Sequence, residues 1–230
     1  MNSNTKRPNQ SRAPTKRRRR ARKQKNNDRS LIMPPKLIRT LRYVDSAYVR
    51  NNPGGNYLVY SFRINDLYDP DPLLLSGSIS GFKEIMQFYA QYRVLHVAAD
   101  IMICNLETFP LMYGMVFSQT NLTGVIASRD DAINALEDPM STRAKILSGK
   151  GGIDRAQLRK GMSCSRILGL TGQYMAESNY AGQGLASPTT PLWLNFIVAS
   201  ATGASLTNGY CTTTTLTFHS EFFARLNLRA

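Results

Sequence analysis

The chain begins with a dense run of basic side chains that could bind a polyanion. Its first 29 residues hold twelve Lys or Arg and one acidic residue, Asp28, for a net charge of +11. The rest of the chain is nearly balanced, with seventeen basic and fourteen acidic side chains. Lys and Arg near phosphates release condensed counterions, which gives salt-sensitive affinity without sequence preference. The candidate nucleic-acid-binding residues are Lys6, Arg7, Arg12, Lys16, Arg17, Arg18, Arg19, Arg20, Arg22, Lys23, Lys25 and Arg29.

The segment that carries these charges lacks the apolar and aromatic side chains that would let it fold. Residues 1–30 contain no large apolar side chain after Met1, so they cannot offset their ordering entropy, and we expect a disordered arm. Without aromatic stacking platforms the arm should neutralise phosphates and carry little sequence information. Two alternatives stay open. The run from Lys16 to Lys25 could be read by an import receptor as a nuclear localisation signal, or the arm could be a solvated tail with no partner.

Three aspartates at close spacing form a second candidate site. Asp66, Asp69 and Asp71 offer the oxygen ligands that Ca²⁺ prefers, particularly if a neighbouring subunit completed the coordination shell. The alternative is that they cap turns around Pro70 and Pro72, where Asp is favoured. We favour the turns, so no metal is predicted and calcium stays a secondary possibility.

No pattern typical of catalysis is present in the sequence. The two histidines, His96 and His219, each fall inside a predicted strand, where a lone His is more often a packed or surface residue than a ligand. The motifs of serine hydrolases, zinc proteases and dinucleotide-binding folds are missing. We therefore predict neither an enzyme nor a cofactor.

The cysteines and the distribution of apolar residues indicate whether the protein lies in a reducing compartment and whether it crosses a membrane. Cys104, Cys164 and Cys211 are widely separated and odd in number, which argues against a disulfide framework and a structural zinc site. We expect three buried, reduced thiols. No stretch reaches the roughly 18 apolar residues that span a bilayer, and the N-terminus lacks the apolar run of a signal peptide. The sequence thus predicts a reducing compartment and no membrane.

Strand-like segments make up most of residues 31–230. Leu58, Tyr60, Phe62 and Ile64 alternate along one face of a strand at 56–64, with polar Ser61 on the other. Further strands are predicted over 92–106, 111–117, 158–168, 192–199 and 212–228, the last rich in Thr and aromatic residues.

Two short helices are predicted between these strands. One follows a plausible cap at Ser80, with apolar side chains at helical spacing: Phe82, Ile85, Met86, Tyr89 and Tyr92. The other covers 128–137, where Ser128 and Asp131 match a capping box. Long connections run over 65–79, 119–155 and 171–191. This arrangement favours an antiparallel β-sandwich with elaborate loops over βαβ units.

Three stretches resemble the coat proteins of small circular single-stranded DNA viruses, including circovirus-like groups. Residues Tyr60 to Pro70 look like the strand and "N-x-x-x-D-P" loop of those capsids. Gly81 to Leu95 is similar to their "G-F-x-x-(W/F)-x-x-(F/Y)-Y-x-x-Y-x-V" segment, and Pro191-Leu192-Trp193 resembles a shortened "P-x-x-x-W" opening of a late strand. The overall plan also resembles the satellite tobacco necrosis virus coat protein.

The resemblance implies an all-β, eight-stranded antiparallel jelly roll with short loop helices over 31–230 as the shell domain. It implies self-assembly into a small icosahedral T=1 shell of sixty copies, with the arm of residues 1–30 inside. The partners would be further copies of the chain, viral single-stranded DNA or RNA, and a host import receptor. The protein would lie in the virion and, during assembly, in the host nucleus or cytoplasm.

Two alternatives from other classes remain. A cellular RNA-binding or ribosomal-type protein with a basic tail would be a monomer with a basic patch on its body, whereas this body is nearly neutral and its loops are apolar. A sugar-binding jelly roll would have no use for the arm.

Overall fold

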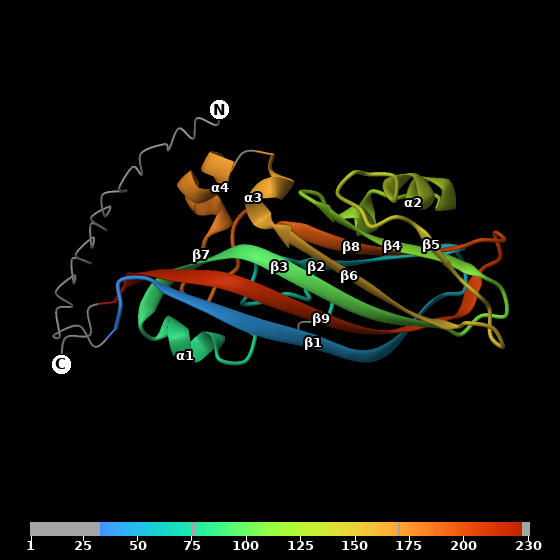
Figure 1. The fold of residues 1–230 in the computed structure, drawn as a ribbon, viewed down its shortest axis with the longest axis horizontal. Helices are drawn as coiled ribbons and strands as arrows, with labels where there is room; N and C mark the ends of the chain where they lie inside the picture. Colours follow the sequence, from blue (N-terminus) through green and yellow to red (C-terminus); the bar gives the residue numbers. More distant parts are fainter. Residues whose placement is uncertain (1–32, 75–76, 170, 227–230) are drawn as a thin grey trace, which may run out of the picture. The chain divides into compact units, whose positions relative to one another are not determined.

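Two antiparallel sheets packed face to face dominate the computed structural model (Figure 1). It describes residues 33–74, 77–169 and 171–226. One sheet has the order β1-β9-β3-β6, with β7 paired to β3, and the other has the order β2-β8-β4-β5. The strands are β1 (Leu37–Asn52), β2 (Tyr57–Arg63), β3 (Tyr89–Asn105), β4 (Leu111–Ser118), β5 (Lys145–Leu147), β6 (Arg155–Ser163), β7 (Gly182–Gln183), β8 (Trp193–Ser200) and β9 (Leu206–Arg225).

The strand order identifies the fold. The two-residue strand β7 only extends the first sheet beside Gln91 and Tyr92. The other eight strands, counted along the chain, lie in the orders first-eighth-third-sixth and second-seventh-fourth-fifth. This order is that of a jelly roll, in which two Greek keys fold into a double sheet. The predicted all-β jelly roll is therefore confirmed.

The sandwich is held together by side chains that alternate inward along each strand. On β9, Leu216, Phe218, Ser220 and Phe222 are fully buried and point inward, while Thr217 and His219 between them face outward. The three apolar side chains among them meet Phe62 of β2 and Ile101 of β3 in one continuous cluster. Burial of each such side chain contributes about 1.5–3 kcal/mol, so the period of two along β9 sets which face of the sheet becomes core.

A second layer covers the outer face of the β2-β8-β4-β5 sheet. The 3-10 turn η1 (Leu122–Gly124) and helix α2 (Arg129–Ala135) belong to the connection between β4 and β5. They enclose a separate apolar cluster made of Val59, Val116, Ile126, Ala132, Leu136 and Ile197. Strand β8 is therefore buried on both faces along its whole length, and even Ser61 of β2 is covered.

The helices agree only in part with the prediction. Ser128 caps α2 as predicted, because its side chain accepts a hydrogen bond from the Asp131 amide at 3.1 Å. Helix α1 is shorter than predicted and covers only Phe82–Met86. Ser80 is not its cap; Gly81 takes that position with a φ of 82° and no side-chain hydrogen bond.

Tyr89 and Tyr92, assigned to the first helix by their spacing, instead lie at the start of β3. Both side chains enter the same core as Phe82 and Met86. The apolar spacing therefore marked one buried surface shared by a helix and a strand, and could not show where the helix ended.

Several other elements differ from expectation. Strand β1 was not predicted, and β9 begins earlier than the expected 212. The strand predicted over 158–168 ends at Ser163, whose side chain accepts from the Arg166 amide and starts a helical turn. The predicted 171–191 connection holds helix α4 and a further turn. The remaining short elements are α3 (Cys164–Ile167), α4 (Thr171–Ala176) and η2 (Ser178–Tyr180). No helix among the described residues is long and apolar enough to cross a membrane.

Candidate nucleic-acid interface

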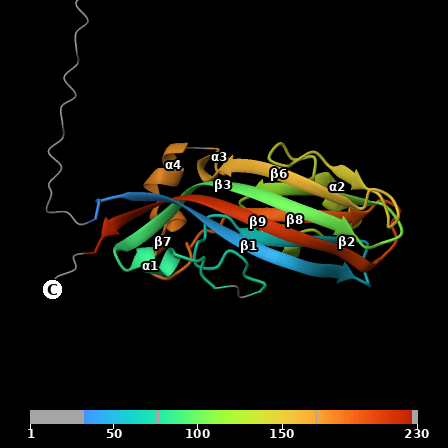
Figure 2. The ribbon, with the colours of Figure 1, turned by 60° about the horizontal axis from the view of Figure 1, so that its bottom comes forward.

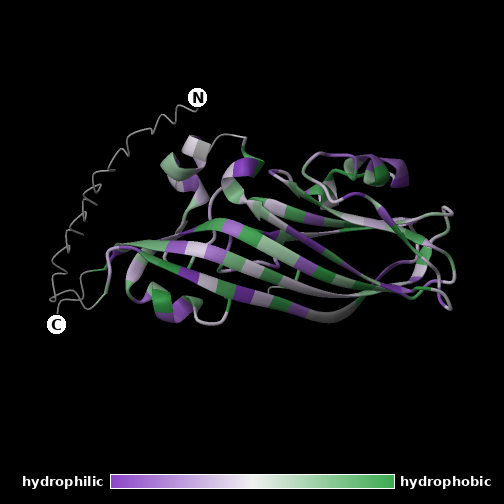
Figure 3. Ribbon diagram, in the orientation of Figure 1, coloured by the Kyte–Doolittle hydropathy of each residue, from purple (hydrophilic) through white to green (hydrophobic). Residues whose placement is uncertain are grey.

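The outer face of the β1-β9-β3-β6 sheet is open, in contrast to the covered outer face of the other sheet. In Figure 2 these four strands lie side by side, and α2 lies on the far side of the sandwich. Polar and apolar bands alternate along them in Figure 3, as expected of a sheet with one buried and one open face. The face is therefore a regular surface that is open to a ligand.

Small polar side chains follow the middle of this face. Thr213, Thr215 and Thr217 of β9 point outward between buried neighbours. Their partners in register on β3 are Met102, Asp100 and Ala98. The threonine side chains are short, so a ligand backbone can approach this strand closely, and their hydroxyl groups can donate to phosphate oxygens.

Positive charge exceeds negative charge on the same face. Arg159 of β6 donates to Asp100 of β3 at 2.9 Å, and that pair is balanced. Arg42 of β1 and Arg155 of β6 are exposed and form no ion pair with any described residue. The face thus presents two uncompensated guanidinium groups, whose planar fork matches phosphate geometry.

The two histidines meet in register on this face but do not form a joint site. His96 of β3 lies opposite His219 of β9, and both are exposed, so of the two alternatives, packed or surface, the structure places them at the surface. The His219 Nδ1 lies 3.4 Å from the Thr40 hydroxyl on one side. The His96 ring lies over Gly161 on the other side, where an added Cβ would come within 2.9 Å of it. Because the rings lean apart, they do not converge on one ligand.

The basic residues predicted to bind nucleic acid, Lys6 through Arg29, lie outside the described residues. The described chain begins at Met33, whose carbonyl accepts a hydrogen bond from Arg225 at 3.2 Å. The next carbonyl, that of Pro34, accepts from the buried Tyr89 hydroxyl at 2.8 Å. These contacts hold the start of β1, so the charged segment joins the body at an edge strand of the open sheet.

The three candidate calcium ligands, Asp66, Asp69 and Asp71, are held by hydrogen bonds and ion pairs within the chain. Asp66 is fully buried and accepts from the Tyr68 amide at 2.9 Å and the Tyr92 hydroxyl at 3.0 Å. Asp69 lies 3.4 Å from Arg63, which also reaches Asp66 at 3.6 Å.

Asp71 instead accepts from the Tyr60 hydroxyl at 2.7 Å and from the Leu73 amide at 3.2 Å. Among the described residues no group of three or more acidic, His or Cys side chains could hold a metal ion. The aspartates accept hydrogen bonds from backbone amides in the turns after β2, and the secondary alternative, a calcium site shared with a second copy, stays untested.

A buried ionic network inside the sandwich was not predicted. Arg50 of β1 donates to Asp45 at 2.8 Å and to Thr212 of β9 at 2.7 Å, and all three are nearly inaccessible. Burial raises the pKa of Tyr60 and of Asp71, which adjoin this network. The sequence did not indicate that Asp45 is buried, because strand β1 was not predicted and its inward and outward positions were therefore unknown. The network joins strands of both sheets, which suggests a structural role.

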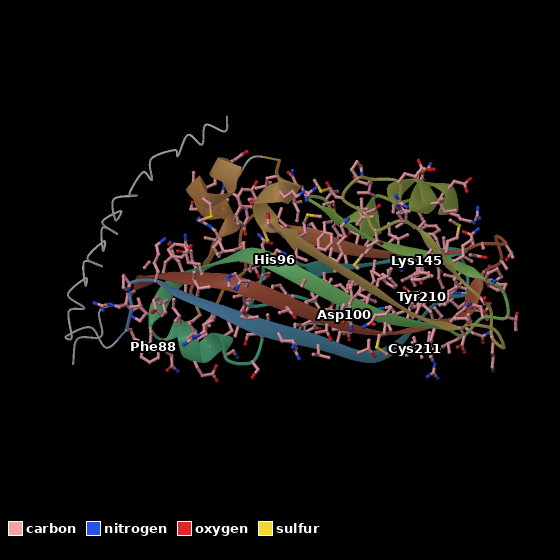
Figure 4. The ribbon with its side chains drawn as sticks, viewed as in Figure 1. Phe88, His96, Asp100, Lys145, Tyr210 and Cys211 are labelled. Atoms are coloured by element: carbon pink, nitrogen blue, oxygen red, sulfur yellow. The ribbon has the colours of Figure 1, made fainter. Side chains whose placement is uncertain are left out.

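The cysteines differ from the expectation of three buried thiols. All three are free, but only Cys164 is fully buried; Cys104 and Cys211 are partly exposed on the open face. Figure 4 labels Cys211, Asp100 and His96 along that sheet. The outward positions follow from the strand alternation of β3 and β9, in which Ile103 and Tyr210 point into the core and the cysteines beside them point out.

Comparison with known proteins shows similarity at the level of solved structures. No protein-family model matches the chain, and no curated protein matches it. It is similar to the semi-empty VLP of a nodavirus of the giant freshwater prawn Macrobrachium rosenbergii, with 12% identity, a TM-score of 0.45, and coverage of 100% of this chain and 98% of that chain. For Mud crab tombus-like virus the identity is 10%, the TM-score 0.45 and the coverage 88% and 96%. For Desmodium yellow mottle tymovirus the identity is 14%, the TM-score 0.38, and the coverage 89% of this chain and 99% of that chain.

Proposed function

We propose that the chain is the coat protein of a small icosahedral virus, and that its N-terminal arm binds the packaged genome. One observation carries the proposal: a segment with a net charge of +11 is joined to a nearly neutral jelly roll at an edge strand of its open sheet. The nearly neutral body can pack against further copies of itself and so build a shell. The arm is too polar to fold alone, and its charge suits it to hold a polyanion.

The arm supplies the affinity for nucleic acid. Twelve basic side chains without aromatic residues neutralise phosphates and do not read bases. If sixty copies assemble, their arms bring about 660 positive charges inward, which neutralises a genome on the order of a kilobase. The unpaired Arg42 and Arg155 on the open face add a weaker, second contact for the same backbone. DNA and RNA are both compatible with this binding mode.

The body supplies the contacts between copies. The connections and the short strand β5 place apolar side chains at the surface: Leu73 is 58% exposed, Val125 61%, Ile146 68% and Ile153 79%. Exposed apolar groups of this kind mark protein interaction sites when they lie together. Heterologous contacts that close under rotation generate rings and shells, and we infer a shell of sixty copies. The circovirus-like and satellite-virus resemblances remain predictions about the subfamily, as do nuclear import and assembly in the nucleus or cytoplasm.

The first test is size-exclusion chromatography with light scattering and the 260/280 nm absorbance ratio of the full-length protein. We expect a megadalton species with nucleic-acid absorbance. A variant lacking residues 2–29 should keep a folded body and lose the nucleic acid. A monomer near the chain mass of 25.7 kDa that still shifts RNA or DNA on a gel would replace the coat proposal with a basic-tailed binding protein.

A further inference from the structure

Two of the three cysteines face each other across neighbouring strands. Cys104 of β3 and Cys211 of β9 are directly opposite in register. Their neighbours in sequence, Ile103, Tyr210 and Thr212, are buried, so both thiols lie on the outer side of the sheet. This pair lies more than 100 positions apart in the chain and is created entirely by strand pairing.

The spacing of the pair suits a covalent bond. The Leu106 amide donates to the Gly209 carbonyl at 3.1 Å, two positions along in the same register. By alternation Cys104 and Cys211 form a hydrogen-bonded pair, whose Cα atoms in antiparallel sheets lie about 5.5 Å apart. Disulfides accept Cα separations of about 4.4–6.8 Å. The Cα separation therefore suits a disulfide, while the Cβ atoms of a hydrogen-bonded pair lie near the far end of the range of about 4.5–5.5 Å, so closing the bond requires a local approach of the two strands by about 1 Å.

The pair is reachable from solvent. Both thiols line a hollow of about 510 Å³ on the open face, together with Met102, Arg155 and Thr213. That volume admits a small organic disulfide. Cys164 is different. It is fully buried, so an oxidant cannot reach it, and burial raises the pKa of its thiol to about 12, so the reactive thiolate does not form near neutral pH.

We propose that Cys104 and Cys211 form a thiol–disulfide site that closes to a cross-strand bond between β3 and β9 when the protein meets a small-molecule disulfide oxidant. One cysteine thiolate attacks the oxidant, forms a mixed disulfide and releases one small thiol. The second thiolate attacks the protein sulfur of that mixed disulfide and releases the other small thiol. The two cysteines lose two protons and two electrons in total, and one oxidant molecule becomes two thiols.

The bond would join the two central strands of the open sheet. It closes a loop of more than 100 residues in the unfolded chain, and loops of that length give large entropic stabilisation. A hydrogen-bonded strand pair holds its side chains farther apart than a relaxed disulfide prefers, so the bond should reduce readily. The site thus distinguishes a reducing cell interior from an oxidising medium and does not depend on the arm or on shell formation.

The test treats purified full-length protein with oxidised glutathione at pH 8, followed by alkylation and mass spectrometry under denaturing conditions. We expect the loss of two free thiols, no retained glutathione, and one cross-linked peptide pair containing Cys104 and Cys211. The melting temperature should rise by about 5 °C and return on reduction. Cys164→Ser is the matched control and should behave like the unmodified protein.

Cys104→Ser should instead retain one glutathione on Cys211, because the resolving thiol is missing. Three unreacted thiols, lasting glutathione adducts on the unmodified protein, or a disulfide between two copies would each overturn the proposal. None of these results bears on nucleic-acid packaging, which the absorbance ratio measures separately.

Discussion

The guanidinium carbon of Arg50 lies 3.7 Å from the centre of the Tyr60 ring, inside the sandwich. Arg50 is on β1 and Tyr60 on β2, so the contact crosses from one sheet to the other. Arg50 also pairs with Asp45, which is 3% exposed. A cation over an aromatic face and beside a carboxylate is well compensated, but removing it leaves a buried, unpaired negative charge.

Replacement of this arginine should therefore be strongly destabilising. Arg50→Met keeps the length of the side chain and leaves Asp45 without its cation, for an expected loss of about 3–5 kcal/mol in the free energy of unfolding. Urea unfolding followed by the fluorescence of Trp193, the single tryptophan, measures it. Arg42→Met on the open face of the same strand is the control and should cost less than about 0.5 kcal/mol. Equal costs would show that the network does not stabilise the fold.

Asp71 should make stability depend on pH in a defined direction. Burial raises the pKa of Asp71 above the ordinary value of 3.8. The hydrogen bond from Tyr60 acts in the opposite direction but is the smaller effect. A carboxyl whose folded pKa is raised favours the folded state while protonated, and that contribution is lost as the pH rises through the folded pKa. Asp71→Asn keeps an acceptor without the charge. Its stability relative to the unmodified protein should therefore increase between pH 3 and pH 7 in urea titrations.

The contrasting variant is Asp71→Ala. It removes the acceptor used by the Tyr60 hydroxyl and the Leu73 amide, so it should be less stable than Asp71→Asn at every pH. If the difference in unfolding free energy between Asp71→Asn and the unmodified protein did not change with pH, the raised pKa of Asp71 would be contradicted.

The open face should contribute to nucleic-acid binding beyond the arm. Arg42→Gln combined with Arg155→Gln removes two guanidinium groups and should lower the slope of log affinity against log salt concentration by about 2. Fluorescence anisotropy with a labelled single strand measures the slope. Arg143→Gln with Lys145→Gln removes the same charge at exposed positions in and beside β5 of the other sheet. Lys145 is labelled in Figure 4. If the two double variants lose affinity equally, net charge alone is responsible and the face has no special role.

The cap of α2 can be tested by a single substitution. Ser128→Ala removes the acceptor of the Asp131 amide hydrogen bond and should cost about 1 kcal/mol. Because α2 covers the second apolar cluster, amide exchange should accelerate in residues 129–136 and around Ile126. Ser128→Asp, which retains a capping oxygen, should restore protection, and unchanged exchange in Ser128→Ala would show that packing alone holds the helix.

Local signals were sufficient for several parts of the protein. Strands β2, β3, β4 and β8 and the Ser128 cap each follow from neighbours a few positions apart, through alternation, apolar content or capping chemistry. The charge asymmetry between the first 29 residues and the rest needs only composition. Strand β1 escaped prediction because its outward side chains include Ile38 and Val44 as well as charges, which blurs the alternation that marks a half-buried strand.

The sequence by itself determined the all-β sandwich class, the basic arm and the absence of catalytic motifs, because these depend on composition and short-range periodicity, while the jelly roll was implied only by the family resemblance. Only the tertiary structure decided that Arg50 lies over Tyr60, that Asp66 and Asp71 take separate partners, and that Cys104 lies opposite Cys211. Each relationship rests on how strands and loops pack against one another, and the two cysteines lie more than 100 positions apart in the chain. Pairing of this kind is set by the register of whole sheets packed against one core, which no short window of sequence contains.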